Sequence, residues 1–371
     1  MHGGEWSRRE FLKTAGQCAF AFGGIMTFGS LINCCTTMSF IPQDKGPVKL
    51  RQLTGHKIKY LEKGILFGVD GFGETRLDDY AGGKDRDPAA YLQFYKDVLG
   101  HLPAFNGRMW IYADDNIRYP ASFIDSNREI GVIPYNYLSM NTPARMYGGL
   151  ENLVDSKEFN HKIKLYAAMV ADQKIPHFIT TMREVNGIYL RRPWKGKSAK
   201  TTTKLMRHIW QICEDEGANE YLTWVWEIIP PEAGEGYRNP ERFFPGEKFV
   251  DWIGLSTYYQ QPYRTQKFSH FIHRTYGNMQ ENHPEIPIMM AEIGYTRKPG
   301  KDIGQSQWFD DALQVISSLK AIKAVMVING SNFHGKRKLN HTLSKETYQV
   351  LRKYLDNGTL IGADSMQQKE A

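Results

Sequence analysis

Two glutamates follow apolar, strand-like runs in this sequence. Glu184 comes directly after the run 177–183, and Glu292 comes directly after the run 288–291. Two carboxyl groups about 5–5.5 Å apart can cleave a glycosidic bond with retention, because one protonates the leaving oxygen while the other attacks the anomeric carbon. Taken alone, either glutamate could be a capped or ion-paired surface residue. Taken together, they are the predicted catalytic pair.

The elements that must position this pair alternate along the chain. Short continuous apolar runs suit strands buried on both faces, and strands that alternate with amphipathic stretches imply a parallel sheet. The predicted strands are Ile65–Asp70, Met109–Tyr112, Gly131–Asn136, His177–Arg183, Leu222–Trp226, Val250–Ser256, Ile288–Ala291 and Ala324–Ile328. The predicted helices are Pro88–Gly100, Ala121–Glu129, Glu151–Gln173, Lys200–Glu216, Phe268–Glu281, Gln305–Leu319 and Lys345–Leu355.

These units predict an α/β fold, a (β/α)₈ TIM barrel over residues 61–358. In such a barrel the active site lies at the carboxyl ends of the strands, where strands four and seven can bring Glu184 and Glu292 together. Reading those ends gives Asp70, Asp114 with Asp115, Asn136, Glu184, Trp226 with Glu227, Tyr258, Glu292 and Asn329.

Cofactor and metal chemistry are not expected. No Gly-x-Gly-x-x-Gly follows the first predicted strand, so a dinucleotide-binding fold is disfavoured. No His-x-His follows that strand and the histidines are scattered, which disfavours a metal-dependent barrel hydrolase. We therefore predict an enzyme without a cofactor or metal.

Three motifs within about Gly64–Asn357 resemble glycoside hydrolase family 26, a group that includes β-mannanases and some β-glucanases and xylanases. Arg183–Gly187 is similar to the family's Glu-x-Asn-Gly acid/base motif. Phe249–Tyr258 is similar to its sixth strand, and Pro287–Gly294 is similar to its nucleophile strand. The three motifs occur in the family's order, on the matching strands.

The resemblance implies a role for each matching residue. Glu184 would be the acid/base, Glu292 the nucleophile, and Tyr258 the phenol that hydrogen-bonds the nucleophile. Arg183 would point away from Glu184 in a regular strand, but at a strand end it could still reach a substrate oxygen or a carboxylate. Trp226 could line the sugar cleft. The residues predicted to bind substrate are Asp70, Arg183, Asn186, Tyr189, Trp226, Tyr258 and Asn329.

The chain departs from the family pattern around the predicted subsite. Arg183 replaces the usual His, Tyr189 a Trp, and Ser256 an Asp, while Asn329 ends a strand that usually ends near a Trp. A basic loop, residues 189–197, follows the acid/base. The predicted substrate is a polysaccharide, either mannan-like or decorated and acidic, cleaved by a retaining endo-β-glycanase. A catalytically weak or inactive barrel that binds glycan in an assembly or capture system is the alternative.

The first 35 residues read as an export signal. Ser7–Lys13 resembles a twin-arginine motif, and a weakly apolar, Gly-rich stretch follows it. An uncleaved membrane anchor is one alternative, and lipidation at Cys34 is another. The predicted location is periplasmic or extracellular, with membrane contact only through a lipid anchor. Residues 36–60 read as a lead-in and 359–371 as a polar tail.

Composition agrees with a large globular domain. The chain has 371 residues, of which 41% are hydrophobic and 13% aromatic, which is ample material for a core. The net charge of +7 is dispersed and lacks any nucleic-acid signature, so no nucleic-acid partner is expected. Cys213 is the single cysteine after residue 35, so it is predicted to be a buried apolar residue rather than half of a bridge. The oligomeric state stays open.

Overall fold

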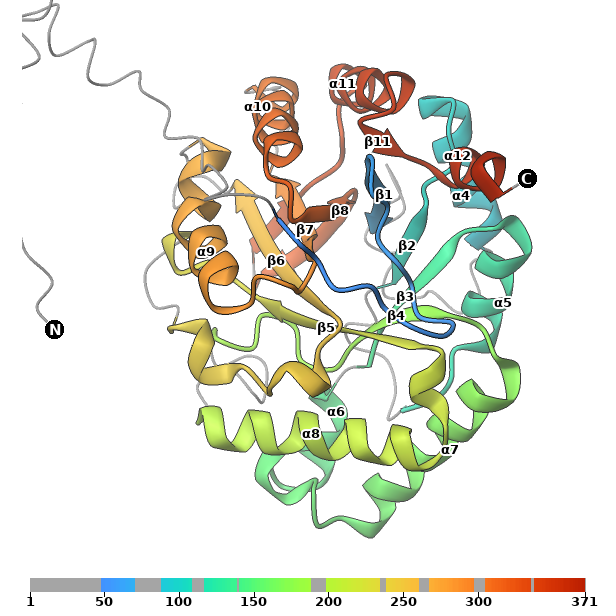
Figure 1. Ribbon diagram of the computed structural model, residues 1–371, viewed down its shortest axis with the longest axis vertical. Coiled ribbons are helices and arrows are strands. Elements are labelled where there is room, and N and C mark those ends of the chain that lie inside the picture. The colour runs from blue at the N-terminus through green and yellow to red at the C-terminus, as the bar shows by residue number, and fades with distance from the viewer. Residues whose placement is uncertain are drawn as a thin grey trace, which may run out of the picture. The chain divides into compact units, whose positions relative to one another are not determined.

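A closed parallel barrel forms the centre of the computed structural model (Figure 1). The structure describes residues 48–70, 88–108, 117–138, 140–187, 198–233, 238–259, 267–296, 304–334 and 337–370. Its barrel strands are β1 (Ile65–Asp70), β2 (Phe105–Arg108), β3 (Ile133–Tyr137), β4 (His177–Thr180), β5 (Leu222–Ile228), β6 (Trp252–Tyr259), β7 (Ile288–Tyr295) and β8 (Ile322–Ile328).

Pairing between the first and last strands closes the barrel. Each strand from β1 to β8 pairs in parallel with the next, and β1 also pairs with β8 from Leu66 opposite Ala324 to Asp70 opposite Ile328. Parallel strands joined by helical crossovers are the definition of the (β/α)₈ barrel. The predicted fold class is confirmed.

Helices surround the strands (Figure 1). They are α4 (Pro88–Leu99), α5 (Ala121–Ile130), α6 (Asn141–Met146), α7 (Lys157–Gln173), α8 (Ala199–Asp215), α9 (Phe268–Asn282), α10 (Gln305–Ser318), α11 (Lys345–Asp356) and α12 (Ala363–Glu370). Ser156, Ser198 and Ser344 begin α7, α8 and α11 by accepting a hydrogen bond from a first-turn backbone N–H. Cys213 is fully buried on α8. Among the described helices none is both long and apolar enough to cross a membrane.

Several strands end elsewhere than predicted. β5, β6 and β7 continue beyond the predicted ends at Trp226, Ser256 and Ala291, and β5 and β7 thereby include the polar residues Glu227 and Glu292. Ladder hydrogen bonds join backbone groups, so a polar side chain does not end a strand. β4 stops early, at Thr180. β2 lies just before the predicted strand 109–112, which falls outside the described residues.

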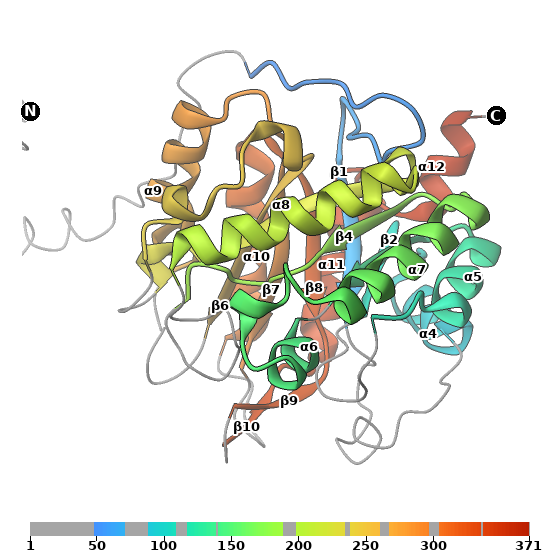
Figure 2. The same ribbon diagram turned by 90° about the horizontal axis from the view of Figure 1, so that it is seen from below.

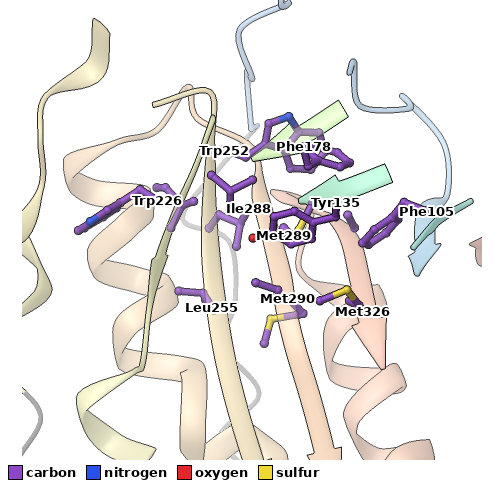
Figure 3. Close-up of a cluster of buried hydrophobic side chains, with 14 of the residues drawn as sticks. Phe105, Tyr135, Phe178, Trp226, Trp252, Leu255, Ile288, Met289, Met290 and Met326 are labelled. Atoms are coloured by element: carbon purple, nitrogen blue, oxygen red, sulfur yellow. The ribbon is translucent and has the colours of Figure 1, made fainter. Parts of the chain in front are cut away.

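Large side chains fill the barrel interior (Figure 3). Phe178 meets Phe105, Tyr135 and Trp252 edge-on, with ring centroids 5.7, 5.8 and 5.5 Å apart. Glycine makes room for them, because a Cβ on Gly68 would come within 2.4 Å of the Phe105 ring. The barrel is therefore packed at this level, and any site must lie beyond it, toward the carboxyl ends of the strands.

The predicted lead-in, from residue 48 onward, is tied to the amino-terminal ends of β5 and β6. Lys57 Nζ contacts both carboxylate oxygens of Asp251 at 2.8 and 2.7 Å. Ile58 N donates to Thr223 Oγ1 at 2.7 Å, and Trp252 Nε1 donates to Ile58 O at 3.3 Å. Figure 2 shows this segment at the end of the barrel opposite the β9–β10 hairpin (Ser331–His334 and Arg337–Asn340).

Replacing Lys57 by methionine should lower the free energy of unfolding by about 1–3 kcal/mol. The change leaves the buried Asp251 carboxylate with the Trp224 backbone N–H as a remaining hydrogen-bond partner. Denaturant titration measures the loss, and Lys59→Met, at an exposed neighbouring position, is the matched control. A Lys57 variant as stable as that control would contradict the structural role of the ion pair.

The predicted polar tail is also structured. Leu360 and Ile361 form β11, which pairs in parallel with Ile65 and Leu66 of β1. Ala363–Glu370 then forms α12. The carboxyl-terminal residues therefore extend the sheet at the amino-terminal end of β1.

Candidate active site

A group of buried polar side chains lies at the carboxyl-terminal side of the interior packing. Arg183 and Glu184 follow β4, while the others lie within β5, β6 and β7, toward their carboxyl ends. Its buried members are Arg183, Glu184, Glu227, Ser256 and Glu292, and the partly exposed Tyr258 adjoins them.

The segment after β4 is not a strand. Glu184 has φ 51°, in the left-handed region, and is 8% exposed. Its carbonyl accepts a hydrogen bond from Gly187 N at 2.9 Å, and Val185 N donates to Glu227 O at 3.1 Å. This conformation costs a non-glycine residue about 1–2 kcal/mol, and such strain is concentrated at functional sites. The predicted alternation of Arg183 and Glu184 across a strand is therefore wrong, because the strand has already ended.

Arg183 points into the barrel and contacts two carboxylates. Its Nε donates to Glu227 Oε1 at 3.1 Å, and its Nη2 forms an ion pair with Glu292 Oε1. Nη2 also donates to the Tyr258 hydroxyl at 3.4 Å. The guanidinium carbon lies 4.7 Å from the centre of the Tyr137 ring. A planar, permanently charged group is suited to hold several partners at once.

The charge on Arg183 is stabilised by its neighbours. Burial lowers the pKa of the guanidinium, but Glu227, Tyr137, Glu184 and Asp70 raise it, and the net shift is upward. Burial has the opposite effect on the Tyr137 phenol: it raises the pKa of this group, which therefore stays neutral. The charge of Glu184 helps to raise the pKa of Arg183, and Glu292 is ion-paired with the same guanidinium. Both predicted catalytic glutamates therefore interact with one cation.

A β-bulge aims Glu292 into this group. Leu255 of β6 pairs with Met290, but the next residue, Ser256, pairs with Glu292, so Ala291 is an extra residue in β7. The pairing of β7 with β8 shifts over the same residues. A bulge changes the phase of a strand, and this one turns Glu292 to the side of Ser256.

Glu292 is 0% exposed, and its two oxygens differ in environment. Oε1 is ion-paired with Arg183, whereas Oε2 has neither an ion pair nor a hydrogen bond within the described part of the chain. The predicted hydrogen bond from Tyr258 to Glu292 is not present. The Tyr258 hydroxyl accepts from Arg183 instead, and its ring lies 5.8 Å from that of His341. Burial lowers the pKa of His341 to about 4, so this imidazole is neutral.

Two predicted substrate-binding amides are used by the protein itself. Asn186 Nδ2 donates to Ile229 O at 2.8 Å and Arg238 O at 3.0 Å, while its Oδ1 accepts from Ile229 N at 3.0 Å. Asn186 therefore ties the Glu184 segment to the residues after β5.

Asn329 is similarly occupied. Its Nδ2 donates to the hydroxyls of Tyr95 and Tyr348, both at 2.8 Å, and its Oδ1 accepts from Leu343 N at 3.1 Å. Asp70 is 2% exposed, and its carbonyl accepts from Asn329 N at 2.8 Å. Asn329 therefore secures the end of β8, while the Asp70 carboxylate contributes charge to the site.

Trp226 lies apart from the polar group. It is 1% exposed and packs edge-on against Phe244 and His283, with centroids 5.0 and 6.2 Å away. Figure 3 shows it away from Tyr135 and Phe105 in the barrel interior. Tyr189 and the rest of the basic loop, with Asp114 and Asp115, lie outside the described residues.

Glu227 was read from the end of strand five in the sequence but was given no role there, and it lies within the buried polar group. It is 1% exposed, accepts from Ser256 Oγ at 2.8 Å through Oε1, and contacts the Tyr135 hydroxyl at 3.5 Å through Oε2. A charged residue inside the apolar run 222–229 requires a buried partner, and that signal could have identified it. Within the described residues, no three His, Cys, Asp or Glu side chains gather as metal ligands.

The fold and these side chains define a (β/α)₈ barrel with a buried carboxylate–arginine group toward the carboxyl-terminal ends of its strands. Residues 150–329 match the family model described as Glycosyl hydrolase family 26. That segment contains Glu184, Glu227 and Glu292. Together with the named relatives below, the match supports a glycoside hydrolase similar to family 26.

Curated relatives are similar over part of the chain. A β-1,3-xylanase TXYA of a Vibrio species is 21% identical over 202 residues, which are 50% of this chain and 42% of the relative. A β-1,3-xylanase of an Alcaligenes species is 23% identical over 119 residues, covering 31% of this chain and 23% of the relative. The chain thus spans less than half the length of either relative.

Solved structures share the fold. The family 26 domain of an endo-β-mannanase/endo-β-glucanase from Prevotella bryantii matches with a TM-score of 0.55 at 15% identity, over 83% of this chain and 93% of that one. A family 26 β-mannanase from Bacteroides ovatus matches with a TM-score of 0.56 at 17% identity, over 81% and 91%. At this identity the likeness concerns the fold alone.

Proposed function

We propose that the chain is a retaining endo-β-glycanase that cleaves a β-linked polysaccharide through Glu184 and Glu292. One observation carries this proposal: Glu292 is held by Arg183 through Oε1, while Oε2 has no hydrogen-bond partner among the described residues. A nucleophile needs one oxygen that is oriented by the protein and another that can form a bond. The family match over residues 150–329 supports the same reaction class.

The proposed reaction has two steps. Glu292 Oε2 attacks the anomeric carbon while Glu184 protonates the glycosidic oxygen, so the bond to the leaving sugar breaks and a glycosyl ester forms. Glu184, now a carboxylate, then removes a proton from water, and the resulting attack on the anomeric carbon releases Glu292. Low exposure of both carboxyl groups strengthens their interactions with the charge that develops on the sugar.

The proposed substrate is a decorated or acidic β-glycan, with plain mannan as the weaker substrate. The motive is the sequence of the loop that follows Glu184, which contains Arg191, Arg192, Lys195 and Lys197. Each charge-assisted contact to a carboxylate contributes about 1.5–3 kcal/mol, so one contact shifts preference about tenfold or more.

A panel of polysaccharides tests this proposal. It contains a uronate-bearing glycan, unsubstituted β-mannan and β-1,3-xylan, the last because two curated relatives are named β-1,3-xylanases. We expect kcat/KM to be highest on the uronate-bearing glycan and to fall toward that of the neutral glycans as salt is raised. Efficient cleavage of plain mannan that salt does not change would contradict the role of the basic loop.

A second candidate function is glycan binding with little or no turnover. The observation that favours it is the direct ion pair between Arg183 and a fully buried Glu292, because a tightly paired carboxylate is a poorer nucleophile. Retention on insoluble polysaccharide without new reducing ends would support this candidate. New reducing ends would support the glycanase.

Export and lipidation are proposed from the sequence alone. The twin-arginine motif and Cys34 both lie outside the described residues. We propose that residues 1–35 direct export, with a lipid anchor at Cys34 as the one route to membrane contact.

A further inference from the structure

Arg183 lies between two carboxylates, and the first of them is not one of the proposed catalytic pair. Glu227 Oε1 binds the guanidinium Nε at 3.1 Å, and Glu292 Oε1 is ion-paired with Nη2. The three residues are 6%, 1% and 0% exposed, in the order Arg183, Glu227 and Glu292. Glu227 therefore reaches the proposed nucleophile through a single intervening side chain.

Glu227 is itself held by hydrogen bonds from two other strands. Ser256 Oγ of β6 donates to Oε1 at 2.8 Å, and Tyr135 of β3 contacts Oε2 at 3.5 Å. Burial, followed by the charge of Glu227, raises the pKa of Tyr135, so this phenol keeps its proton and remains a donor. The Glu227 carboxylate is thus held by side chains of β6 and β3, with Oε1 in contact with Arg183.

We propose that Glu227 is a positioning residue that orients Arg183 and shares its charge, so that Glu292 is held in place without being fully neutralised. The inference rests on the proposed function of Glu292. A guanidinium that met Glu292 alone would form a closed pair, whose carboxylate would be a weaker nucleophile. With a second carboxylate bound at Nε, the positive charge of Arg183 is shared with Glu227 and is not directed at Glu292 alone.

The competing role for Glu227 is structural only, as a counter-ion for a buried arginine. Buried charges require partners, and Arg183 would be costly to leave unpaired. The two roles differ in what they predict for the pH dependence of activity. A purely structural role affects how much enzyme is folded, whereas a positioning role alters the electrostatic field at Glu184 and Glu292.

The decisive variant is Glu227→Gln, which keeps the size and an oxygen acceptor but removes the charge. We expect kcat/KM to fall about 100-fold, because Arg183 moves toward Glu292 and misplaces the nucleophile. We also expect both limbs of the pH profile to move to lower pH by about one unit, because a negative charge near both catalytic carboxyl groups is lost. Ser256→Ala, which loosens Glu227 without removing its charge, should lower kcat/KM but leave the limbs in place.

Asp251→Asn is the matched control. Asp251 is another buried carboxylate, 7% exposed, but it pairs with Lys57 at the opposite end of the barrel. This variant should lose stability and keep the wild-type pH profile. Thermal unfolding of every variant separates loss of fold from loss of rate, and Ser256→Ala is the second probe if Glu227→Gln does not fold.

Each outcome decides one question. If the wild type is active and Glu227→Gln keeps both the limbs of its pH profile and its kcat/KM per folded molecule, the positioning role is overturned. The proposed glycanase function would still stand. If Ser256→Ala is the surviving probe, a kcat/KM per folded molecule equal to that of the wild type would likewise overturn the positioning role. A wild type that releases no reducing ends from any β-glycan would instead overturn the proposed function itself.

Discussion

Glu292→Gln is expected to abolish hydrolysis, with kcat reduced by at least about 10⁴-fold. The amide cannot form the glycosyl ester, so the double displacement loses its first step. A loss of that size corresponds to about 5.5 kcal/mol of activation free energy. Reducing-end release under substrate saturation measures it, with the wild type diluted to give the same signal.

The fold should survive this substitution. Arg183 keeps Glu227 and Tyr258 as partners, so the buried guanidinium is not left unpaired. Circular dichroism and thermal unfolding check this point, and Asp251→Asn provides a matched acid-to-amide change in another buried site. A folded Glu292→Gln enzyme with wild-type turnover would eliminate the two-glutamate reaction.

Glu184→Ala should reduce kcat on polysaccharide by about 10²–10⁴-fold. An activated aryl glycoside with a good leaving group should lose far less in the first step, since that step then needs no proton donor. Azide should restore turnover and give a glycosyl azide, because a small anion can attack the intermediate without a general base. Equal losses on both substrates, unaffected by azide, would remove Glu184 from the acid/base role.

The free energy of unfolding of Glu184 variants provides an independent test of the backbone conformation at this position. Glu184 has φ 51°, a conformation that glycine adopts freely and alanine does not. Glu184→Gly should therefore be about 1 kcal/mol more stable than Glu184→Ala. Denaturant midpoints of the two variants compare them directly.

The barrel could be predicted because its signals are periodic and repeated. The alternation of short apolar runs with amphipathic stretches appears once for each strand–helix unit, so errors at single boundaries do not change the topology. The residues at which individual strands begin and end were harder to predict from the sequence. β4 ends at Thr180, before the left-handed conformation of Glu184, and no residue-type rule assigns such a conformation to a glutamate.

The candidate site could be predicted only in part, because β5 is buried on both faces. In a half-exposed strand, polarity would tell which residues face inward, but every residue of β5 is buried. Trp226 and Glu227 were both read from this strand end, but only the aromatic residue was assigned a role. The direction of Arg183, the partner of Glu227, was predicted from the alternation of side chains along a strand. That alternation does not apply at Arg183, because β4 ends at Thr180.

The asparagines show a different limit. Asn186 and Asn329 were reasonable ligands for sugar hydroxyls by residue type and position. In the folded chain their amides satisfy backbone and tyrosine groups instead. Such a choice depends on which internal groups would otherwise lack partners, and this becomes known only when the loops are in place.

The bulge in β7 has a consequence for how this barrel can change over time. Because Ala291 is an extra residue opposite β6, the number of residues between Met290 and Glu292 sets the position that the glutamate takes opposite Ser256. Losing Ala291 would remove the bulge and leave the glutamate opposite Ser256, whereas gaining one more residue before Glu292 would turn it toward the surrounding helices and place an aliphatic side chain at the site. Point substitutions can therefore accumulate in this strand, whereas insertions are confined to the loops. Libraries that recombine such barrels should join their segments outside 288–295.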